Sequence, residues 1–373
     1  MRKRGYNIIV GTRSARVLIS KYIPFAEVFK TELSARKQAV LAAIVKTYIE
    51  TGEPIGSKIL TELIENAPSS ATLRNEMNEL CALGLLEQPH TSAGRVPTSM
   101  GYRLYVNSLM QPAQLSDSTK RYIDSRLDVT GCDPRILPQL AADILCELTG
   151  LPAVYCHLAD ERVYLKSAQL LPTGKRAAVL LIITSDGRTL SRACRIPSGF
   201  SQELADEFEK IFEKSLKRRL LTSFNRAALQ GIVASAGISA LELTPIIALL
   251  FDMVGEAAGE SVSIRGSNEL YNVCGEVDAR RIIALAEKGE PLLSTICGRK
   301  TDTEVIFGND TGLAGLTRAA LVVSKYYSGN RYCGSIGVIG TARMSYDRII
   351  PSIEYTALKL TKVMSEAAKD MED

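Results

Sequence analysis

The residues best suited to chemistry lie in residues 86–106, which read LEQPHTSAGRVPTSMGYRLYV. This stretch places a histidine, two arginines, several hydroxyl side chains and two prolines around Ala93-Gly94. Such groups could hold a phosphate, act on a substrate or contact nucleic acid, because cationic and hydroxyl side chains are common donors to phosphate oxygens. Residues 88–110 contain no acidic side chain, so this stretch is locally positive.

A second group of polar side chains lies just upstream, in SATLRNEMNELCALG (residues 70–84). Leu73, Met77 and Leu80 recur at helical spacing, which predicts an amphipathic helix that ends near Gly84. The other side of this helix carries small hydroxyl and amide groups with one arginine, namely Ser70, Thr72, Arg74, Asn75 and Asn78. These side chains suit base edges and phosphates, and an ordinary solvated helix face is the alternative interpretation.

Two further helices are predicted before this one. The first begins after Ser34, a suitable N-cap, and the run TGEP at residues 51–54 ends it. A shorter helix follows. Behind the third helix, residues 85–88 read as a short strand, and the chain reverses around Ala93-Gly94. Three helices and a turn-rich ribbon are typical of a winged helix-turn-helix domain, whose third helix enters the major groove of DNA.

The third predicted helix carries the base-reading residues of this interpretation. Arg74 and Asn75 suit guanine and adenine edges, where a good bidentate pair discriminates by ~1–3 kcal/mol. Ser70 and Thr72 lie in the first turn, where hydroxyls and free backbone N–H groups hold phosphate. Either Ser69 or Ser70 must also cap the helix, so one of these serines has a structural role.

The predicted wing adds contacts to the DNA backbone or the minor groove. Arg95 is the main candidate, Gly94 permits the tight reversal, and the flanking prolines stiffen the ribbon. Tyr102 either reaches a phosphate or packs into the domain core. The complete set of predicted DNA-binding residues is Lys58, Ser70, Thr72, Arg74, Asn75, Asn78, His90, Thr91, Ser92, Arg95, Tyr102 and Arg103.

Composition limits the other possibilities. The 373 residues carry a net charge of +4, and residues 1–31 hold seven basic residues against one acidic residue. The rest of the chain is therefore slightly acidic, so any affinity for nucleic acid must come from local clusters. Eight cysteines without a CxxC pair and only two histidines argue against a zinc site or a secreted disulfide framework, and favour the cytoplasm. The apolar runs are too short to span a bilayer.

Nothing in the sequence predicts an enzyme or a cofactor. His157 lies in an alternating apolar strand and is interpreted as a packed residue. Cys156 beside it is a weak nucleophile candidate with no visible activating partner. The glycines of GSIGVIG (residues 334–340) lie in a strand pattern and lack the helix start and later acid of a dinucleotide site.

Four stretches of the sequence have motifs in common with a known bacterial family, namely TYIETGEPIGSK (47–58), SSATLRNEMNEL (69–80), LEQPHTSAGRVPT-x-x-GYR-x-YV (86–106) and GSIGVIG-x-x-RM (334–344). These stretches resemble the heat-inducible transcription repressor HrcA family. They occur in the family's order and extend from about Leu33 to the last helix. The resemblance implies an α+β fold with a winged helix-turn-helix domain, a GAF-like domain and a dimerisation domain inserted into it.

The helix and strand patterns divide the chain accordingly. We expect a basic, flexible N-terminal extension at 1–31, the winged helix-turn-helix domain at 32–110, a linker at 111–120, the GAF-like domain at 121–200 and 299–373, and the inserted dimerisation domain at 201–298.

The resemblance also implies the function. It implies a homodimer that binds an inverted-repeat DNA operator, represses chaperone operons and is relieved under heat stress. It further implies that a GroE-type chaperonin modulates the repressor. A regulator whose GAF-like domain senses a small molecule is the alternative hypothesis, although the sequence shows no obvious polar constellation for a ligand.

Overall fold

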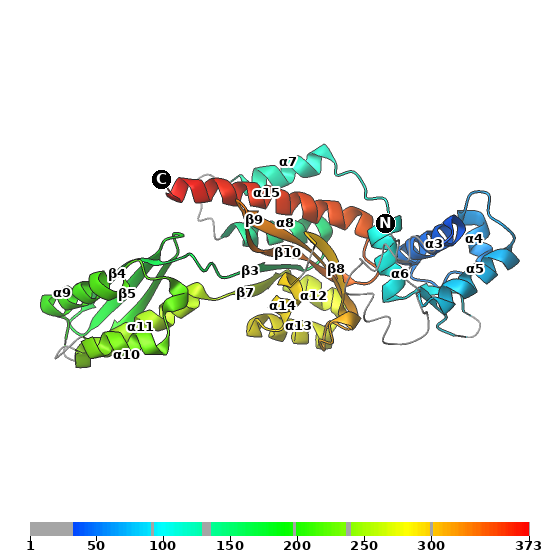
Figure 1. The fold of residues 1–373 in the computed structure, drawn as a ribbon. Coiled ribbons are helices and arrows are strands. Elements are labelled where there is room, and N and C mark those ends of the chain that lie inside the picture. Colours follow the sequence, from blue (N-terminus) through cyan, green and yellow to red (C-terminus); the bar gives the residue numbers. More distant parts are fainter. Residues whose placement is uncertain are drawn as a thin grey trace, which may run out of the picture.

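The computed structural model describes residues 33–90, 93–128, 136–196, 199–235, 240–298 and 301–372, so the predicted extension at 1–31 lies outside the described residues. Figure 1 shows three parts in a row: a helical N-terminal part, a central sheet with helices on both faces, and a smaller sheet with helices at the far end. Across the described residues, no helix is both long and apolar enough to cross a membrane.

The N-terminal part is a winged helix-turn-helix domain, as predicted. It contains α3 (Ala35–Thr51), α4 (Ser57–Leu63), α5 (Ser70–Ala82), β1 (Leu86–Glu87), β2 (Val96–Pro97), α6 (Ser99–Leu104) and the π-helical turn η1 (Tyr105–Leu109). The Ser34 hydroxyl caps α3 by accepting from the backbone N–H of Lys37 at 3.3 Å. Gly52 ends α3 with a φ of 74°, a left-handed conformation that favours glycine. Strands β1 and β2 pair antiparallel as the base of the wing.

Apolar residues from each helix close the core of this domain. Ile44 of α3, Leu60 of α4, and Leu73 and Leu80 of α5 are fully buried. Each lies three or four residues from another apolar residue of its helix, so one face of each helix points inward. The opposite face of α5 is thereby left to solvent.

The central part is built on a five-stranded antiparallel sheet in the order β7-β3-β10-β9-β8. Its strands are β3 (Ala153–His157), β7 (Ser261–Arg265), β8 (Thr303–Phe307), β9 (Ala319–Ser328) and β10 (Arg331–Thr341). A 3₁₀ turn, η6 (Gly308–Asp310), follows β8. Helices cover both faces, which agrees with the predicted α+β, GAF-like domain.

Each face of this sheet has its own helical layer. Helices α7 (Asp117–Leu127), α8 (Leu137–Thr149) and α15 (Tyr346–Glu372) lie on one face, and α12 (Ser267–Cys274), α13 (Glu276–Lys288) and α14 (Leu292–Cys297) lie on the other (Figure 1). In β9, Val322 packs toward the first layer and Leu321 toward the second. This two-sided burial explains why the strand reads as a continuous apolar run.

The glycine-rich run at residues 334–340 forms part of β10, which confirms the strand prediction. At Gly337, a Cβ would overlap the carbonyl oxygen of Val322 on the neighbouring strand. The glycine therefore allows close approach of two backbones in the sheet. It lies inside the strand, whereas a dinucleotide loop places its glycines in the turn between a strand and a helix.

The distal part is interposed between β3 and β7. It contains β4 (Leu165–Gly174), β5 (Ala177–Thr184), β6 (Thr189–Arg195), α9 (Gln202–Ile211), η3 (Phe212–Leu216), η4 (Leu221–Ser223), α10 (Arg226–Ser235) and α11 (Ala240–Ala258). Strands β4, β5 and β6 form a separate antiparallel sheet that shares one core with these helices.

The insertion therefore differs in extent from the sequence expectation of 201–298. Its three strands were expected within the GAF-like segment 121–200, whereas they share the insertion's core with α9 and α11. Helices α12, α13 and α14 were expected in the insertion, whereas they pack on the central sheet. We propose residues 163–258 as the insertion, because these residues contribute to the separate core.

Candidate nucleic-acid interface

Helix α5 presents a polar face whose composition matches the sequence prediction. Arg74, Asn75 and Asn78 are exposed, whereas Leu73 and Met77 are buried. With 3.6 residues per turn, the three polar side chains fall within a sector of about 100° on the helix surface. A guanidinium and two carboxamides on one helix face are groups that can donate to base edges.

The N-terminus of α5 assigns the two serines to different roles. Ser69 is the N-cap, since its Oγ accepts from the backbone N–H of Thr72 at 3.2 Å and also contacts the Thr72 hydroxyl at 3.0 Å. The Ser70 hydroxyl lies 2.8 Å from that of Ser57 and so ties α4 to α5. Ser70 and Thr72, both predicted as phosphate contacts, are thus half-buried and already hydrogen-bonded within the domain.

The charges around α5 leave its exposed polar face cationic. Glu76 and Glu79 of α5 pair with Lys37 of α3, at 3.3 and 2.8 Å, and these carboxylates raise the pKa of Lys37, Glu79 being the main cause. The negative charges of Glu76 and Glu79 are therefore neutralised by Lys37, on the side of α5 that faces α3. Lys58 and Arg74 are both exposed, and neither side chain has an ion-pair partner among the described residues.

The wing is held against α5 by Arg95. Its Nη2 donates to Oδ1 of Asn78 at 2.8 Å, and the side chain is half-buried. The Nε of Arg95 is buried without a partner in the part of the chain described. The sequence predicts Asn78 and Arg95 as separate DNA contacts, whereas in the structure their side chains are hydrogen-bonded and connect the helix to the wing. His90 is exposed near the wing tip, and Thr91 and Ser92 lie outside the described residues.

Gly94 is required for close approach. The wing also pairs with the α3–α4 loop, because the backbone of Ile55 and that of Arg95 exchange hydrogen bonds of 3.0 and 2.8 Å. A Cβ at Gly94 would overlap the carbonyl group of Ile55. The sequence prediction explained this glycine by a tight reversal, whereas contact between two backbones is the reason visible in the structure.

Tyr102 and Arg103 contact the central part of the protein. Tyr102 is 3% exposed, and its ring packs near those of Phe307 and Tyr346, with centroids 5.9 and 6.3 Å away. Burial raises its pKa, and its hydroxyl has no partner among the described residues. Arg103 forms an ion pair with Asp310 at 2.6 Å. Both side chains are therefore excluded from our candidate DNA surface. Tyr102 is buried, as the packing alternative expected, but its ring contacts lie in the central part of the protein.

A contact that the sequence did not predict joins α3 to the central part. The Arg343 guanidinium lies over the Tyr48 ring, 5.6 Å from its centroid, and against Gly52 at the end of α3. A cation at this position is favourable because the C-terminus of a helix carries partial negative charge. Tyr48 and Gly52 belong to the motif TYIETGEP, and Arg343 belongs to the motif GSIGVIG-x-x-RM. The sequence shows both motifs, but their spacing does not predict that they are in contact.

His157 and Cys156, which the sequence analysis considered for catalysis, are packed inside the protein. His157 Nε2 lies 3.2 Å from Nη2 of Arg188, and burial, with this positive charge as a second cause, lowers its pKa to about 4. Cys156 is fully buried. Within the described ranges, no three His, Cys, Asp or Glu side chains gather as a metal site would require.

Two family descriptions match the chain. Residues 32–110 match the winged helix-turn-helix transcription repressor, HrcA DNA-binding, and residues 137–350 match the HrcA protein C terminal domain. The first match ends with η1, and the second covers most of the central part and the whole insertion.

Full-length relatives and a solved structure agree with these matches. The heat-inducible transcription repressor HrcA of Moorella thermoacetica is 29% identical over 339 residues, which cover 90% of this chain and 98% of the relative. The protein of the same name from Brevibacillus brevis is 29% identical over 336 residues, covering 89% and 98%. A crystal structure described as that of a hypothetical protein has a TM-score of 0.58 at 24% identity, covering 90% and 99%, and shows the same fold.

Proposed function

The chain belongs to the HrcA family of transcription repressors, and from this premise we propose that it represses heat-shock operons by binding an inverted-repeat operator as a dimer. The DNA-binding repressor role follows from the family and its winged helix-turn-helix domain. The operator symmetry, the dimer and the individual contacts are our proposals.

The exposed face of α5 is the observation that carries the proposal. We assign base reading to Arg74 and Asn75, because both are exposed and neither side chain has a hydrogen-bond or ion-pair partner in the part of the chain that is described. Asn78 accepts a hydrogen bond from Arg95 through its Oδ1 and keeps its two amide N–H donors for a base or a phosphate. Lys58, in the first turn of the neighbouring α4, supplies a backbone contact.

We propose that the main role of Arg95 is to hold the wing in place, and not to contact DNA through its charge. Since Arg95 braces the wing against α5, the exposed tip at His90 is held at a fixed place relative to the reading helix. We therefore propose that Arg95 supports affinity by fixing the wing, and that His90 contacts the backbone. Ser70 and Thr72 remain in the proposed interface as first-turn contacts that hold phosphate through the hydrogen-bonding capacity left to their hydroxyls.

A sheet face of the insertion supports the dimer. In β5, Leu180 and Ile182 are buried against the insertion's helices, whereas Val179, Leu181 and Ile183 on the other face are only half-buried. Leu171 of β4 lies opposite Val179 and is 43% exposed. An apolar stripe on an open sheet face is a surface that proteins usually cover.

We propose that a second copy of the chain covers this face. An isologous contact between two identical faces generates twofold symmetry, which matches the symmetry of an inverted repeat. Each subunit provides one α5, so reading two half-sites requires two subunits. Leu181→Glu places a charge in the stripe and should give monomers in size-exclusion chromatography with light scattering. Lys210→Glu, an exposed position on α9 away from this sheet face, is the matched control.

The operator is tested with the full chain and a duplex that carries the inverted repeat upstream of a chaperone operon. We expect one dimer per inverted repeat and an affinity that falls steeply as salt rises, since phosphate contacts release counterions. A duplex with one half-site scrambled should bind much more weakly. Equal affinity for both duplexes would contradict the proposed dimeric reading.

The modulator and the location follow from the family resemblance alone. We propose that a GroE-type chaperonin maintains the active repressor and that the protein works in the cytoplasm, where its operator lies. Operator binding by freshly refolded protein, with and without chaperonin and ATP, tests the first part. An identical active fraction under both conditions would contradict it.

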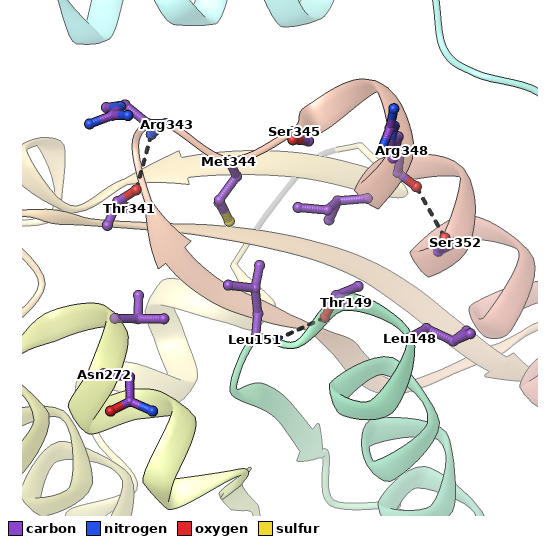
Figure 2. A pocket seen from close by; sticks show the side chains of 12 residues that line it. Leu148, Thr149, Leu151, Asn272, Thr341, Arg343, Met344, Ser345, Arg348 and Ser352 are labelled. Atoms are coloured by element: carbon purple, nitrogen blue, oxygen red, sulfur yellow. Dashed lines mark hydrogen bonds between the residues drawn. The ribbon is translucent and has the colours of Figure 1, made fainter. Parts of the chain in front are cut away.

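A cleft in the central part, close to its contact with α3, favours a second candidate function, ligand sensing. It has a volume of about 560 Å³ and is formed by the end of α8, by α12, and by the loop from β10 into α15. Figure 2 shows Arg343 and Arg348 on one rim with Ser345 between them, and Asn272 on the opposite side. Among the described residues, no acidic side chain lines the cleft, so its chemistry suits a small anion.

This cleft would link a ligand to DNA binding through Arg343, which also contacts the end of α3. Thermal unfolding of the full chain with pyrophosphate, at constant ionic strength, tests the idea. A rise in Tm that Arg348→Gln abolishes and Arg280→Gln retains would support an anion site. No rise with the parent chain would leave the cleft without a role in anion sensing.

A further inference from the structure

Two cysteines far apart in the sequence meet in the central part of the protein. Cys156 of β3 and Cys297, the last residue of α14, are separated by 141 positions, and their sulfur atoms lie 2.9 Å apart. A disulfide requires about 2.05 Å, so the pair needs an approach of less than one ångström. Among the described cysteines, no other pair has its sulfur atoms in contact.

We propose that Cys156 and Cys297 form a redox-responsive thiol pair, which hydrogen peroxide or an organic hydroperoxide converts to a disulfide. The role is separate from DNA reading, since neither residue belongs to the winged helix-turn-helix domain. Disulfides in cytosolic proteins are usually transient and redox-sensing, so a reversible bond at this site fits a reduced compartment.

The surroundings distinguish the two thiols. Cys156 is fully buried, whereas Cys297 is partly exposed and accessible to a small oxidant. Contact with the Cys156 thiol, and secondarily with the Tyr332 hydroxyl, lowers the pKa of Cys297. The reactive form of cysteine is the thiolate, so Cys297 is the residue that attacks peroxide and Cys156 is the resolving thiol.

The chemistry balances in two steps. The Cys297 sulfur attacks one peroxide oxygen, the S–O bond of a sulfenic acid forms as the O–O bond breaks, and the other oxygen leaves as water from hydrogen peroxide or as an alcohol from an organic hydroperoxide. The Cys156 sulfur then attacks the sulfenic sulfur, the S–S bond forms, the S–OH bond breaks, and the Cys156 proton leaves with the hydroxide as water. A dithiol reductant restores both thiols by exchange.

The position of the pair gives the disulfide a structural consequence. Cys156 is the penultimate residue of β3 and lies opposite Val262 of β7. Both connections to the insertion leave the central sheet beside these residues, because β4 follows β3 and α11 precedes β7. A bond from Cys156 to α14 therefore fixes the helical layer to the strand that leads into the insertion.

The test uses the reduced full-length protein, treated with stepwise hydrogen peroxide, alkylated under denaturing conditions and digested for mass spectrometry. We expect a peptide pair linked through Cys156 and Cys297 at the lowest peroxide dose, a fall in free thiols from eight to six, and recovery with dithiothreitol. Oxidation of other cysteines first, with no linked pair, would overturn the proposal in the parent protein itself.

Variants separate the two roles. Cys156→Ser should leave Cys297 to accumulate as a sulfenic acid that dimedone traps, whereas Cys297→Ser should leave Cys156 reduced. Cys333→Ser is the matched control, since Cys333 is a buried cysteine of the same sheet outside the pair, and it should keep the 156–297 link. Loss of the link in this control, with the fold intact by circular dichroism, would contradict the assignment.

Discussion

The hydroxyl of Tyr102 provides a sharp test of the domain junction. It is buried with no hydrogen-bond partner among the described residues, while the ring packs beside Phe307 and Tyr346. An unsatisfied buried hydroxyl costs about 1–3 kcal/mol, so Tyr102→Phe should stabilise the protein by ~1 kcal/mol after the lost van der Waals contacts of the oxygen are counted. Operator affinity should stay unchanged, because the hydroxyl does not reach DNA.

Tyr346→Phe is the matched control for this substitution. The Tyr346 hydroxyl is also buried, but it donates to the carbonyl oxygen of Ala342 at 3.0 Å. Removing this donor strands the acceptor and should destabilise by about 1–3 kcal/mol. Urea denaturation followed by circular dichroism measures both variants. A destabilised Tyr102→Phe protein, or a severalfold loss of operator affinity in it, would refute the buried, DNA-free role of Tyr102.

Three further changes probe other elements. Gly94→Ala should disrupt the wing, because the added Cβ overlaps the backbone of Ile55, and it should lower operator affinity at least tenfold in a mobility-shift assay. Ser69→Ala removes the N-cap of α5 and should destabilise by ~1 kcal/mol in urea denaturation. His157, whose folded pKa of about 4 is below the unfolded value, contributes stability above pH 6.5 that is lost as pH falls through 4. A shift of this size corresponds to about 3 kcal/mol, and His157→Gln should remove that share of the acid sensitivity.

For each of these three substitutions, one outcome would contradict the proposed role of the residue. Gly94→Ala protein with parental affinity would mean that the wing tolerates a side chain at the contact with the α3–α4 loop. An unchanged unfolding midpoint for Ser69→Ala would transfer the capping role to another residue. Equal pH dependence of unfolding for the His157→Gln and parent proteins, between pH 7 and 4, would show that His157 is not held neutral.

Local patterns predicted helix α5 and its exposed face. The spacing of Leu73, Met77 and Leu80 determines which face of α5 is buried, so the exposed position of Arg74 and Asn75 follows from the sequence. The arrangement of helices and ribbon also follows, because caps and turn residues mark each boundary. The residues that read DNA remain predictions, with the choice now narrowed by which side chains are exposed.

Contacts between distant segments were not predictable in the same way. Arg95 is a residue type that commonly contacts phosphate. Its partner Asn78 lies 17 residues earlier, and no local sequence pattern predicts that the two side chains meet. Arg103 pairs with Asp310 across 207 positions. A basic side chain in a stretch without acidic residues is therefore predicted to contact DNA, because its partner in the folded protein is distant in the sequence and cannot be identified from it.

The extent of the insertion shows the same limit for strands. Alternating apolar residues predict that β4, β5 and β6 are strands, but alternation does not tell which sheet a strand joins. Both Leu180 and Leu181 of β5 are apolar, which is expected of a strand in the central sheet as well as of a strand in a dimerising sheet. The separate core, with Phe208 and Leu250 from the insertion's helices, decides between them.

The ratio of operator affinity to scrambled-duplex affinity, measured by fluorescence anisotropy at two salt concentrations, tests the central claim most directly. For Arg74→Ala we expect this ratio to fall about five- to a hundredfold for each half-site, since one bidentate base contact is worth ~1–3 kcal/mol. Lys58→Ala should weaken both duplexes similarly and lower the salt slope by about one per subunit. Arg280→Ala, an exposed arginine on α13, should match the parent. An unchanged ratio for Arg74→Ala would contradict the assignment of α5 as the reading helix.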